Sequence, residues 1–92
     1  MFARTVRIHN RAGLHARPAT LFAETASRFS SAIRATVGDL EADARSILGL
    51  MLLEAVSGVE ITIEAKGEDE IAAVNSLADL VVRGFDEEKP HE

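Results

Sequence analysis

Alternating apolar and polar side chains predict four β-strands along this chain. The segments that alternate in this way are residues 2–9, 33–37, 40–44 and 59–65. Arg4 is the one polar residue on the apolar side of the first segment, and the Gly38-Asp39 pair between the second and third favours a β-hairpin. Because each strand has one apolar and one polar side, we expect a sheet with one covered face and one wet face.

Apolar residues recur at steps of three and four in two longer segments, residues 17–29 and 70–83, which predicts two amphipathic helices. The side chains expected on their buried stripes are Ala19, Phe22, Ala26 and Phe29 in the first helix and Val74, Leu77, Leu80 and Val81 in the second. Asp69 can cap the start of the later helix, and Gly84 suits its end.

The apolar run at residues 47–53 holds more large side chains than one helix face can bury. Ser46 before it is a favourable N-cap residue, which predicts a short third helix. We expect Leu50 and Leu53 in the core. The side chains left over for an exposed apolar patch are Ile47, Leu48 and Met51. Such patches mark contact surfaces, and the alternative is a short helix that is buried on all sides.

The order of these elements, β-α-β-β-α-β-α, predicts an α+β fold in which three helices cover one face of a four-stranded sheet. With 92 residues, the chain is expected to form a single domain over residues 1–92. Within it, residues 85–92 are predicted to be a short acidic tail that frays.

The amino-acid composition of the chain argues against several classes of function. A net charge of −5 and the lack of Tyr and Trp argue against nucleic-acid binding. The lack of cysteine excludes disulfides and thiol catalysis and is compatible with a reducing cytosol. The sequence contains neither a signal peptide nor an apolar run of about 20 residues, so we expect a cytoplasmic protein without membrane insertion. His9 and His91 are expected at the surface, and the histidine spacing gives no signal of a metal site. We expect neither a metal nor a cofactor.

The motif Gly13-Leu14-His15-Ala16-Arg17-Pro18-Ala19 carries the candidate chemistry. The glycine allows a sharp turn and the proline favours a helix start, so His15 is expected where a helix begins. The free N–H groups there, expected at Ala16 and Arg17, together with the helix dipole, suit an anion. The Arg17 guanidinium adds a fork that matches phosphate oxygens. This combination indicates a histidine that carries a phosphoryl group; a loop histidine packed against a helix start is the alternative.

Residues 13–19 resemble the active-site signature of the HPr family, the histidine-containing phosphocarriers of the bacterial phosphoenolpyruvate-dependent sugar phosphotransferase system. Residues 42–51 resemble the second signature of that family, around a regulatory serine, and residues 67–70 resemble the opening of its last helix. The resemblance covers nearly the whole chain. It implies an open-faced β-sandwich whose antiparallel sheet has the strand order 1-4-2-3.

The resemblance also implies roles for individual residues. His15 would accept a phosphoryl group on Nδ1 from Enzyme I and pass it to Enzyme IIA domains, with Arg17 stabilising the moving charge. The carrier would be a monomer with no enzymatic activity of its own. An HPr kinase/phosphorylase would modify Ser46, for which the simpler alternative is a plain N-cap. The surface that meets Enzyme I and Enzyme IIA would comprise Thr20, Leu21, Ile47, Leu48 and Met51.

The chain departs from the family pattern at Arg45, where many members carry Lys, and at Glu54, where many carry Gly after the short helix. Three alternatives to a sugar-system carrier stay open. One is a regulatory member of the same family in a nitrogen-type phosphotransferase system. Another is a histidine-dependent phosphohydrolase, which needs a second acid/base group that the sequence does not clearly offer. The third is a ligand-binding α/β module, for which the usual Gly-rich loop is missing.

Overall fold

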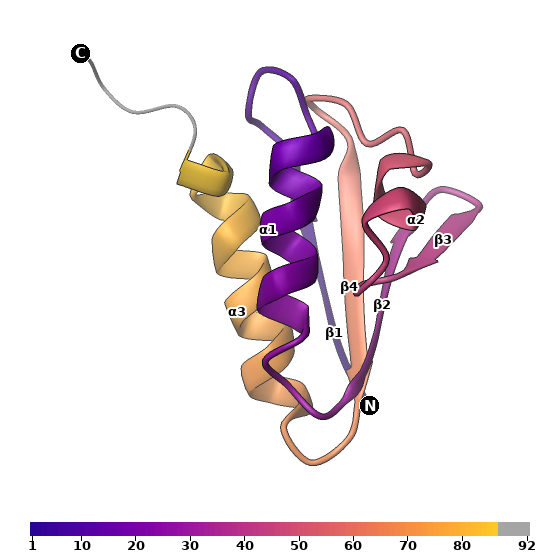
Figure 1. Ribbon diagram of the computed structural model, residues 1–92, viewed down its shortest axis with the longest axis vertical. Helices are drawn as coiled ribbons and strands as arrows, with labels where there is room; N and C mark the ends of the chain where they lie inside the picture. The colour runs from indigo at the N-terminus through magenta and orange to yellow at the C-terminus, as the bar shows by residue number, and fades with distance from the viewer. Residues whose placement is uncertain (87–92) are drawn as a thin grey trace.

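The computed structural model describes residues 1–86, whose strands form one sheet with the helices packed against it (Figure 1). The elements in chain order are β1 (Phe2–Arg7), α1 (Ala16–Ala26), β2 (Ala32–Val37), β3 (Leu40–Asp43), α2 (Ile47–Met51), β4 (Glu60–Lys66), α3 (Glu70–Val82) and the 3-10 helix η1 (Gly84–Asp86). The predicted order of strands and helices is confirmed over this range, with boundaries that differ by one to three residues at most ends.

The sheet is antiparallel with the order β1-β4-β2-β3, as the family resemblance implied. Helices α1 and α3 lie side by side across one face, and α2 lies beside α1 near β3 (Figure 1). The connection from β1 to α1 and the connection from α2 to β4 meet at the same end of the molecule (Figure 1). This end therefore collects the segment that holds His15.

The core lies between the sheet and the helices, and it contains the side chains that the periodicity selected. Those that are fully or almost fully buried are Ala19, Phe22, Ala26, Val74, Leu77, Leu80 and Val81. Phe29 is only partly buried, because α1 ends at Ala26 and the chain has already turned toward β2 at residue 29. Full burial of one such large apolar side chain contributes about 1.5–3 kcal/mol, so the helices are held chiefly by this face.

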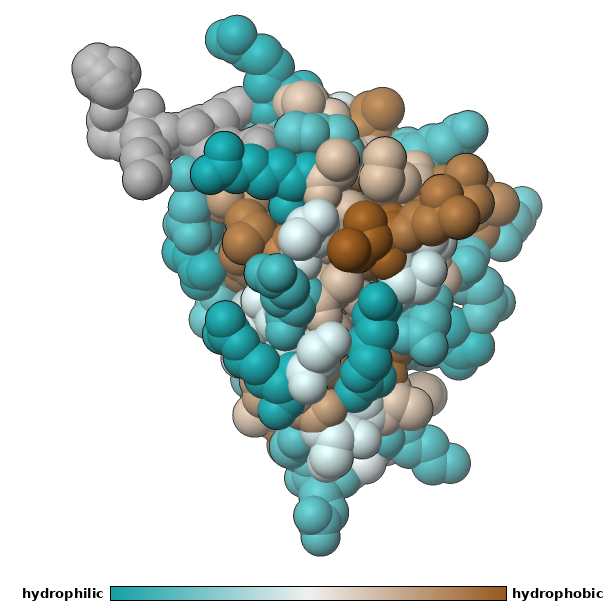
Figure 2. Space-filling model, viewed as in Figure 1, coloured by the Kyte–Doolittle hydropathy of each residue, from teal (hydrophilic) through white to brown (hydrophobic). Residues whose placement is uncertain are grey.

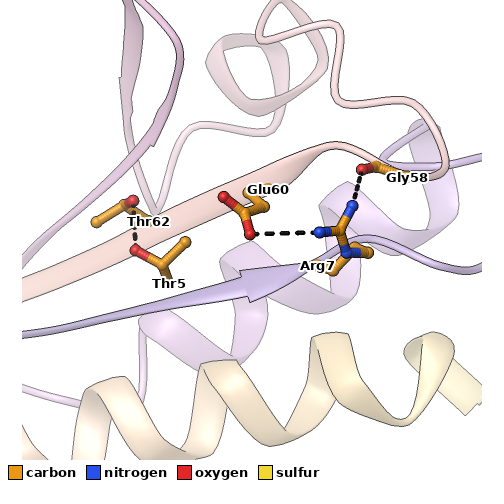
Figure 3. Close-up of polar contacts among 5 residues, drawn as sticks. All are labelled: Thr5, Arg7, Gly58, Glu60 and Thr62. Carbon is orange, nitrogen blue, oxygen red and sulfur yellow. Dashed lines mark hydrogen bonds and ion pairs between the residues drawn. The ribbon is translucent and has the colours of Figure 1, made fainter.

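The opposite face of the sheet carries polar side chains that pair across neighbouring strands (Figure 3). Thr5 and Thr62 share a hydrogen bond of 2.8 Å between their hydroxyl groups. The Arg7 guanidinium donates to the Gly58 carbonyl at 2.8 Å and lies 3.5 Å from the Glu60 carboxylate. Exposed pairs of this kind contribute between about 0 and 1 kcal/mol each, so the open face adds little stability compared with the covered face.

Arg4 lies on the covered side of β1, which explains the interruption of the apolar pattern. Its guanidinium donates to the Asn75 side-chain oxygen at 2.9 Å, and Asn75 belongs to α3. The cation therefore has a polar partner in the helix that covers β1.

Asp69 occupies the N-cap position of α3, but the prediction that its side chain caps this helix is wrong. Its carboxylate instead accepts hydrogen bonds from the Ser30 N–H at 2.9 Å, from the Ser31 N–H at 3.0 Å and from the Ser31 hydroxyl. These bonds, the one from the Ser31 hydroxyl first, lower the pKa of Asp69 to about 2. The carboxylate thus ties the connection between α1 and β2 to the start of α3.

The prediction of a frayed tail is wrong at its first residue. Phe85 is 1% exposed, with a left-handed backbone (φ 57°), and packs into the core after Gly84 ends α3 in a left-handed conformation (φ 69°). His9, although exposed, donates from Nε2 to the Val82 carbonyl at 2.5 Å and so links the end of β1 to the end of α3. The rest of the predicted tail, residues 87–92 with His91, lies outside the described residues.

Candidate functional site

His15 is the N-cap residue of α1 and has an extended backbone (φ −92°, ψ −166°). Its carbonyl accepts the first bond of the helix, from the Ala19 N–H at 2.8 Å, while its side chain makes no capping bond. The helix begins at Ala16, one residue earlier than predicted, so Pro18 is its third residue rather than its second. The half-buried imidazole therefore stands at the helix start without serving the helix as a cap.

Two backbone N–H groups of the first turn of α1 have no acceptor within the helix. They belong to Ala16 and Arg17, because Pro18 has no N–H and the Ala19 N–H already bonds to His15. Both residues are exposed, and the first turn contains no acidic side chain. The positive end of the helix dipole is therefore not neutralised locally, which suits an anion attached to the neighbouring imidazole.

The loop before His15 is held against the segment that follows α2. The Leu14 N–H donates to the Ala55 carbonyl at 2.9 Å, and the Asn10 side-chain amide donates to the Gly13 carbonyl at 2.8 Å. Gly13 has a left-handed backbone (φ 72°), and a Cβ at this position would lie 2.4 Å from the Ala55 oxygen. Only glycine therefore fits here, because a side chain would be strained in this backbone conformation and would collide with Ala55. The turn at Gly13 thereby sets the position of His15.

Helix α2 begins as predicted, with the Ser46 hydroxyl accepting a hydrogen bond from the Gly49 N–H at 2.9 Å. Leu50 and Leu53 are buried, at 0% and 2% exposure. The outward side chains Ile47, Leu48 and Met51 are 41%, 68% and 40% exposed, so the alternative of a fully buried short helix is wrong. Brown, apolar residues accordingly gather over α2 in Figure 2.

Sequence reasoning missed two further exposed apolar residues beside this surface, Leu52 at 64% and Val56 at 59%. Leu52 lies in the predicted apolar run. That run holds more large apolar side chains than one helix face can bury, and this excess was the signal that could have identified Leu52 as exposed. On α1, which packs against α2, Thr20 and Leu21 are half-buried. The Thr20 hydroxyl donates to the Ala16 carbonyl at 2.8 Å, and Leu21 packs partly against the core. We call Thr20, Leu21, Ile47, Leu48, Met51, Leu52 and Val56 the α2 patch.

Residues 1–86 contain no group of three His, Cys, Asp or Glu side chains that could hold a metal ion. No helix among these residues is long and apolar enough to cross a membrane. A hollow of about 410 Å³, lined by Met1 and residues of β2, β3 and β4, contains none of the predicted site residues.

Comparison with known proteins agrees with this geometry. The family model described as the PTS HPr component phosphorylation site matches residues 2–83. The phosphocarrier protein HPr of Treponema pallidum is 42% identical over 88 residues, which cover 96% of this chain and all of the relative. The phosphocarrier protein NPr of Shewanella violacea is 45% identical, covering 91% of this chain and 92% of the relative. The HPr-like protein Crh of Bacillus subtilis is 41% identical, with coverage of 88% and 95%.

Solved structures agree as well. A crystal structure of HPr from Thermoanaerobacter tengcongensis matches with a TM-score of 0.91 and 43% identity, covering 97% of this chain and 100% of that one. A crystal structure of HPr from Bacillus anthracis matches with a TM-score of 0.83 and 36% identity, covering 87% and 95% of the two chains. With an open-faced sandwich, a histidine at an open helix start and relatives along nearly its full length, this chain belongs to the HPr family of phosphocarrier proteins of the phosphotransferase system, which are carriers rather than enzymes.

Proposed function

We propose that His15 accepts a phosphoryl group from phospho-Enzyme I and passes it to Enzyme IIA domains during sugar uptake in the cytoplasm. The observation that carries this proposal is the open first turn of α1, where the imidazole adjoins two N–H groups that the helix does not use. In the transfer, the lone pair of Nδ1 forms a bond to phosphorus while the bond from phosphorus to the donor breaks. The ring proton stays on Nε2, so a neutral imidazole is the nucleophile.

The neighbouring groups stabilise the charge of the transferred group. The N–H groups of Ala16 and Arg17 would donate to phosphoryl oxygens, and the helix dipole would favour the same anion. The exposed Arg17 guanidinium neutralises charge on the equatorial oxygens as the group arrives and leaves. These contacts are strongest when the phosphoryl group is between donor and acceptor, which is where they accelerate transfer.

The α2 patch is the proposed docking surface for Enzyme I and Enzyme IIA. It is small and largely apolar, its part beyond α1 is exposed, and it continues onto half-buried residues of α1, the helix that begins beside His15. A carrier must leave each partner quickly, which a small surface of the weak, transient class allows. We propose that the carrier works as a monomer; crystal structures of a dimer exist for relatives from Thermoanaerobacter tengcongensis and Bacillus subtilis, so size measurement in solution tests this point.

Ser46 is a proposed regulatory site for an HPr kinase/phosphorylase. Its hydroxyl caps α2, whose outward side chains belong to the α2 patch. A phosphate there would be compatible with the helix dipole but would bring about −1.5 to −2 charges beside an apolar docking surface. Docking would then require that this charge be desolvated or matched by a cation, so phosphorylation would weaken binding.

A regulatory role in a nitrogen-type system is the second candidate. Its support is the 45% identity to NPr of Shewanella violacea, which is about as high as the 42% identity to HPr of Treponema pallidum. The discriminating measurement is which Enzyme I paralogue phosphorylates the chain, and whether a sugar-specific Enzyme IIA domain then accepts the group.

The carrier role is tested by incubating the chain with phosphoenolpyruvate and Enzyme I, followed by intact mass measurement. We expect one added phosphoryl group, acid-labile and alkali-stable as a phosphoramidate is, and none on His15→Ala. If His15→Ala takes up phosphate like the wild type, His15 is not the acceptor.

A further inference from the structure

Glu54 is held in a backbone conformation that glycine would adopt more easily. Its φ is 56°, in the left-handed region where a side chain is unfavourable. The turn itself is needed, because it brings the Ala55 carbonyl to the Leu14 N–H at 2.9 Å, and the Val56 N–H donates back to the Glu54 carbonyl at 3.0 Å. Glycine would make the same turn without this strain, so the turn does not explain the glutamate.

The Glu54 side chain does not stabilise the fold in return. It is exposed, and within residues 1–86 its carboxylate takes part in no hydrogen bond and no ion pair. Some exposed carboxylates elsewhere have partners, such as Glu41, which pairs with Arg34 at 2.8 Å, whereas others, such as Glu68, have none among residues 1–86 but adopt no left-handed backbone. The strained position therefore carries a charge that no interaction inside the described fold uses.

The location of Glu54 suggests what that charge meets. In the chain it lies between Leu52 and Val56, two of the exposed residues of the α2 patch. The segment that follows Glu54 lies against the loop that carries His15, at the end of the molecule where the two connections meet (Figure 1). A protein that docks on the α2 patch with its reacting group at His15 would cover Glu54.

We infer that Glu54 is a specificity-determining residue, whose carboxylate pairs with a Lys or Arg side chain on the phosphoryl donor. This inference rests on the proposed carrier function. Covering an unpaired carboxylate in an apolar contact is unfavourable, so a donor without a cation at this place binds less well. A donor with one gains a complementary pair beside the reacting groups, which favours it over its competitors.

The test measures KM and kcat for transfer from two donors, phosphorylated Enzyme I and its phosphorylated nitrogen-type paralogue. The variants are Glu54→Gln, which keeps size and backbone strain but removes the charge, and Glu54→Lys, which reverses it. Glu68→Gln is the matched control, because Glu68 is also exposed but lies in the turn before α3, away from the α2 patch.

With the preferred donor, Glu54→Gln should raise KM by roughly 3- to 10-fold at low salt with little change in kcat, and Glu54→Lys should raise it further. The ratio of kcat/KM between the two donors should fall in both variants, and the difference from wild type should shrink at about 0.5 M salt. Glu68→Gln should behave like the wild type.

An unchanged donor ratio in Glu54→Gln and Glu54→Lys overturns the assignment of Glu54 while leaving the carrier function intact. A lower KM for the preferred donor in Glu54→Lys overturns it too, since the carboxylate would then repel that donor. If neither donor phosphorylates the wild-type chain, the carrier function fails and the role of Glu54 fails with it.

Discussion

The first turn of α2 is closed by its own N-cap, whereas the first turn of α1 is left open. The Ser46 hydroxyl accepts the Gly49 N–H, which satisfies one of the free donors of α2. His15 holds the same position in α1, yet its side chain makes no capping bond, and the N–H groups of Ala16 and Arg17 have no acceptor within the helix.

The two N-cap residues therefore have different roles: Ser46 stabilises its helix, whereas His15 leaves the first turn of its helix open. A capping side chain stabilises a helix by about 1 kcal/mol, and α1 does without it. The open turn leaves the His15 imidazole beside the N–H groups of Ala16 and Arg17, so the missing cap coincides with the proposed phosphoryl site. Helix α1 tolerates this because Phe22 and its neighbours on the buried stripe hold it to the core.

Closing the turn of α1 should abolish function and add stability. In His15→Asp the new carboxylate would accept a first-turn N–H and meet the helix dipole favourably. We expect no phosphoryl uptake from Enzyme I, together with a rise of about 1 kcal/mol in the free energy of unfolding. Intact mass and urea denaturation measure the two effects. If His15→Asp is less stable than the wild type, the first-turn N–H groups of α1 are not available to a capping side chain, which contradicts the open turn.

The two faces of α2 should respond in opposite ways. Leu50→Ala removes a fully buried side chain and should cost about 2–5 kcal/mol of stability, with Leu53→Ala similar. Leu48→Ala and Met51→Ala, on the exposed face, should change stability by less than about 0.5 kcal/mol and raise the KM for Enzyme I. Thermal or urea denaturation beside transfer kinetics makes the comparison, and an unfolded Leu48→Ala protein would contradict the exposed-patch interpretation.

Arg17 should matter for transfer far more than for folding. Loss of one charge-assisted contact to the moving phosphoryl group, as in Arg17→Ala, should slow transfer by roughly 10- to 100-fold. Arg17→Lys should recover part of the rate, since a point charge lacks the fork. Rapid-quench kinetics with phospho-Enzyme I measures the rate, and circular dichroism checks the fold. Unchanged kinetics in Arg17→Ala would remove this side chain from the mechanism.

Opening the turn of α2 gives the complementary experiment. Ser46→Ala should lower the free energy of unfolding by about 1 kcal/mol and leave transfer unchanged. Ser46→Asp keeps a capping oxygen, so the fold should stay stable, but its charge beside the α2 patch should raise the KM for Enzyme I, less so at high salt. Equal KM values for Ser46→Asp and wild type would leave Ser46 as a plain N-cap.

The third helix start, at Asp69, predicts a dependence on pH. Because hydrogen bonds lower the pKa of Asp69 from 3.8 to about 2 in the folded state, its carboxylate stabilises the fold fully above the unfolded pKa. This stabilisation is lost as the pH falls through about 4 toward about 2. Urea denaturation of Asp69→Asn should show lower stability at neutral pH and a weaker loss in acid, with Glu68→Gln as control. Parallel pH profiles for Asp69→Asn and wild type would contradict this role.

Several features of the fold and site could be predicted because they depend on neighbours in the chain. The period of apolar residues selected the buried side chains of α1 and α3, and it separated Leu50 from Leu48 on α2. The Ser46 cap follows from residue type and position alone. The strand order of the sheet came from the family resemblance rather than from periodicity, since alternation says which side of a strand is buried but not which strand pairs with it.

The errors concern contacts between segments that are distant in the chain. Residue type and position predict that Asp69 caps its own helix, but residues 30 and 31 lie close enough to give its carboxylate other donors. The acidic residues that follow Phe85 predict a frayed tail, whereas the Phe85 side chain packs into the hydrophobic core. His9 could not be linked to Val82 from sequence, because 73 positions separate them.

By itself, the sequence determined the elements, their buried faces and the motif that places a histidine, an arginine and a helix start within a few residues. These are local properties, set by side-chain chemistry and by the repeat lengths of strands and helices. Only the tertiary structure decided that the first turn of α1 stays open, that Glu54 adopts a left-handed turn, and that the segment after α2 lies against the loop of His15. These depend on which surfaces the packed core leaves exposed and on which donors and acceptors the fold brings within reach.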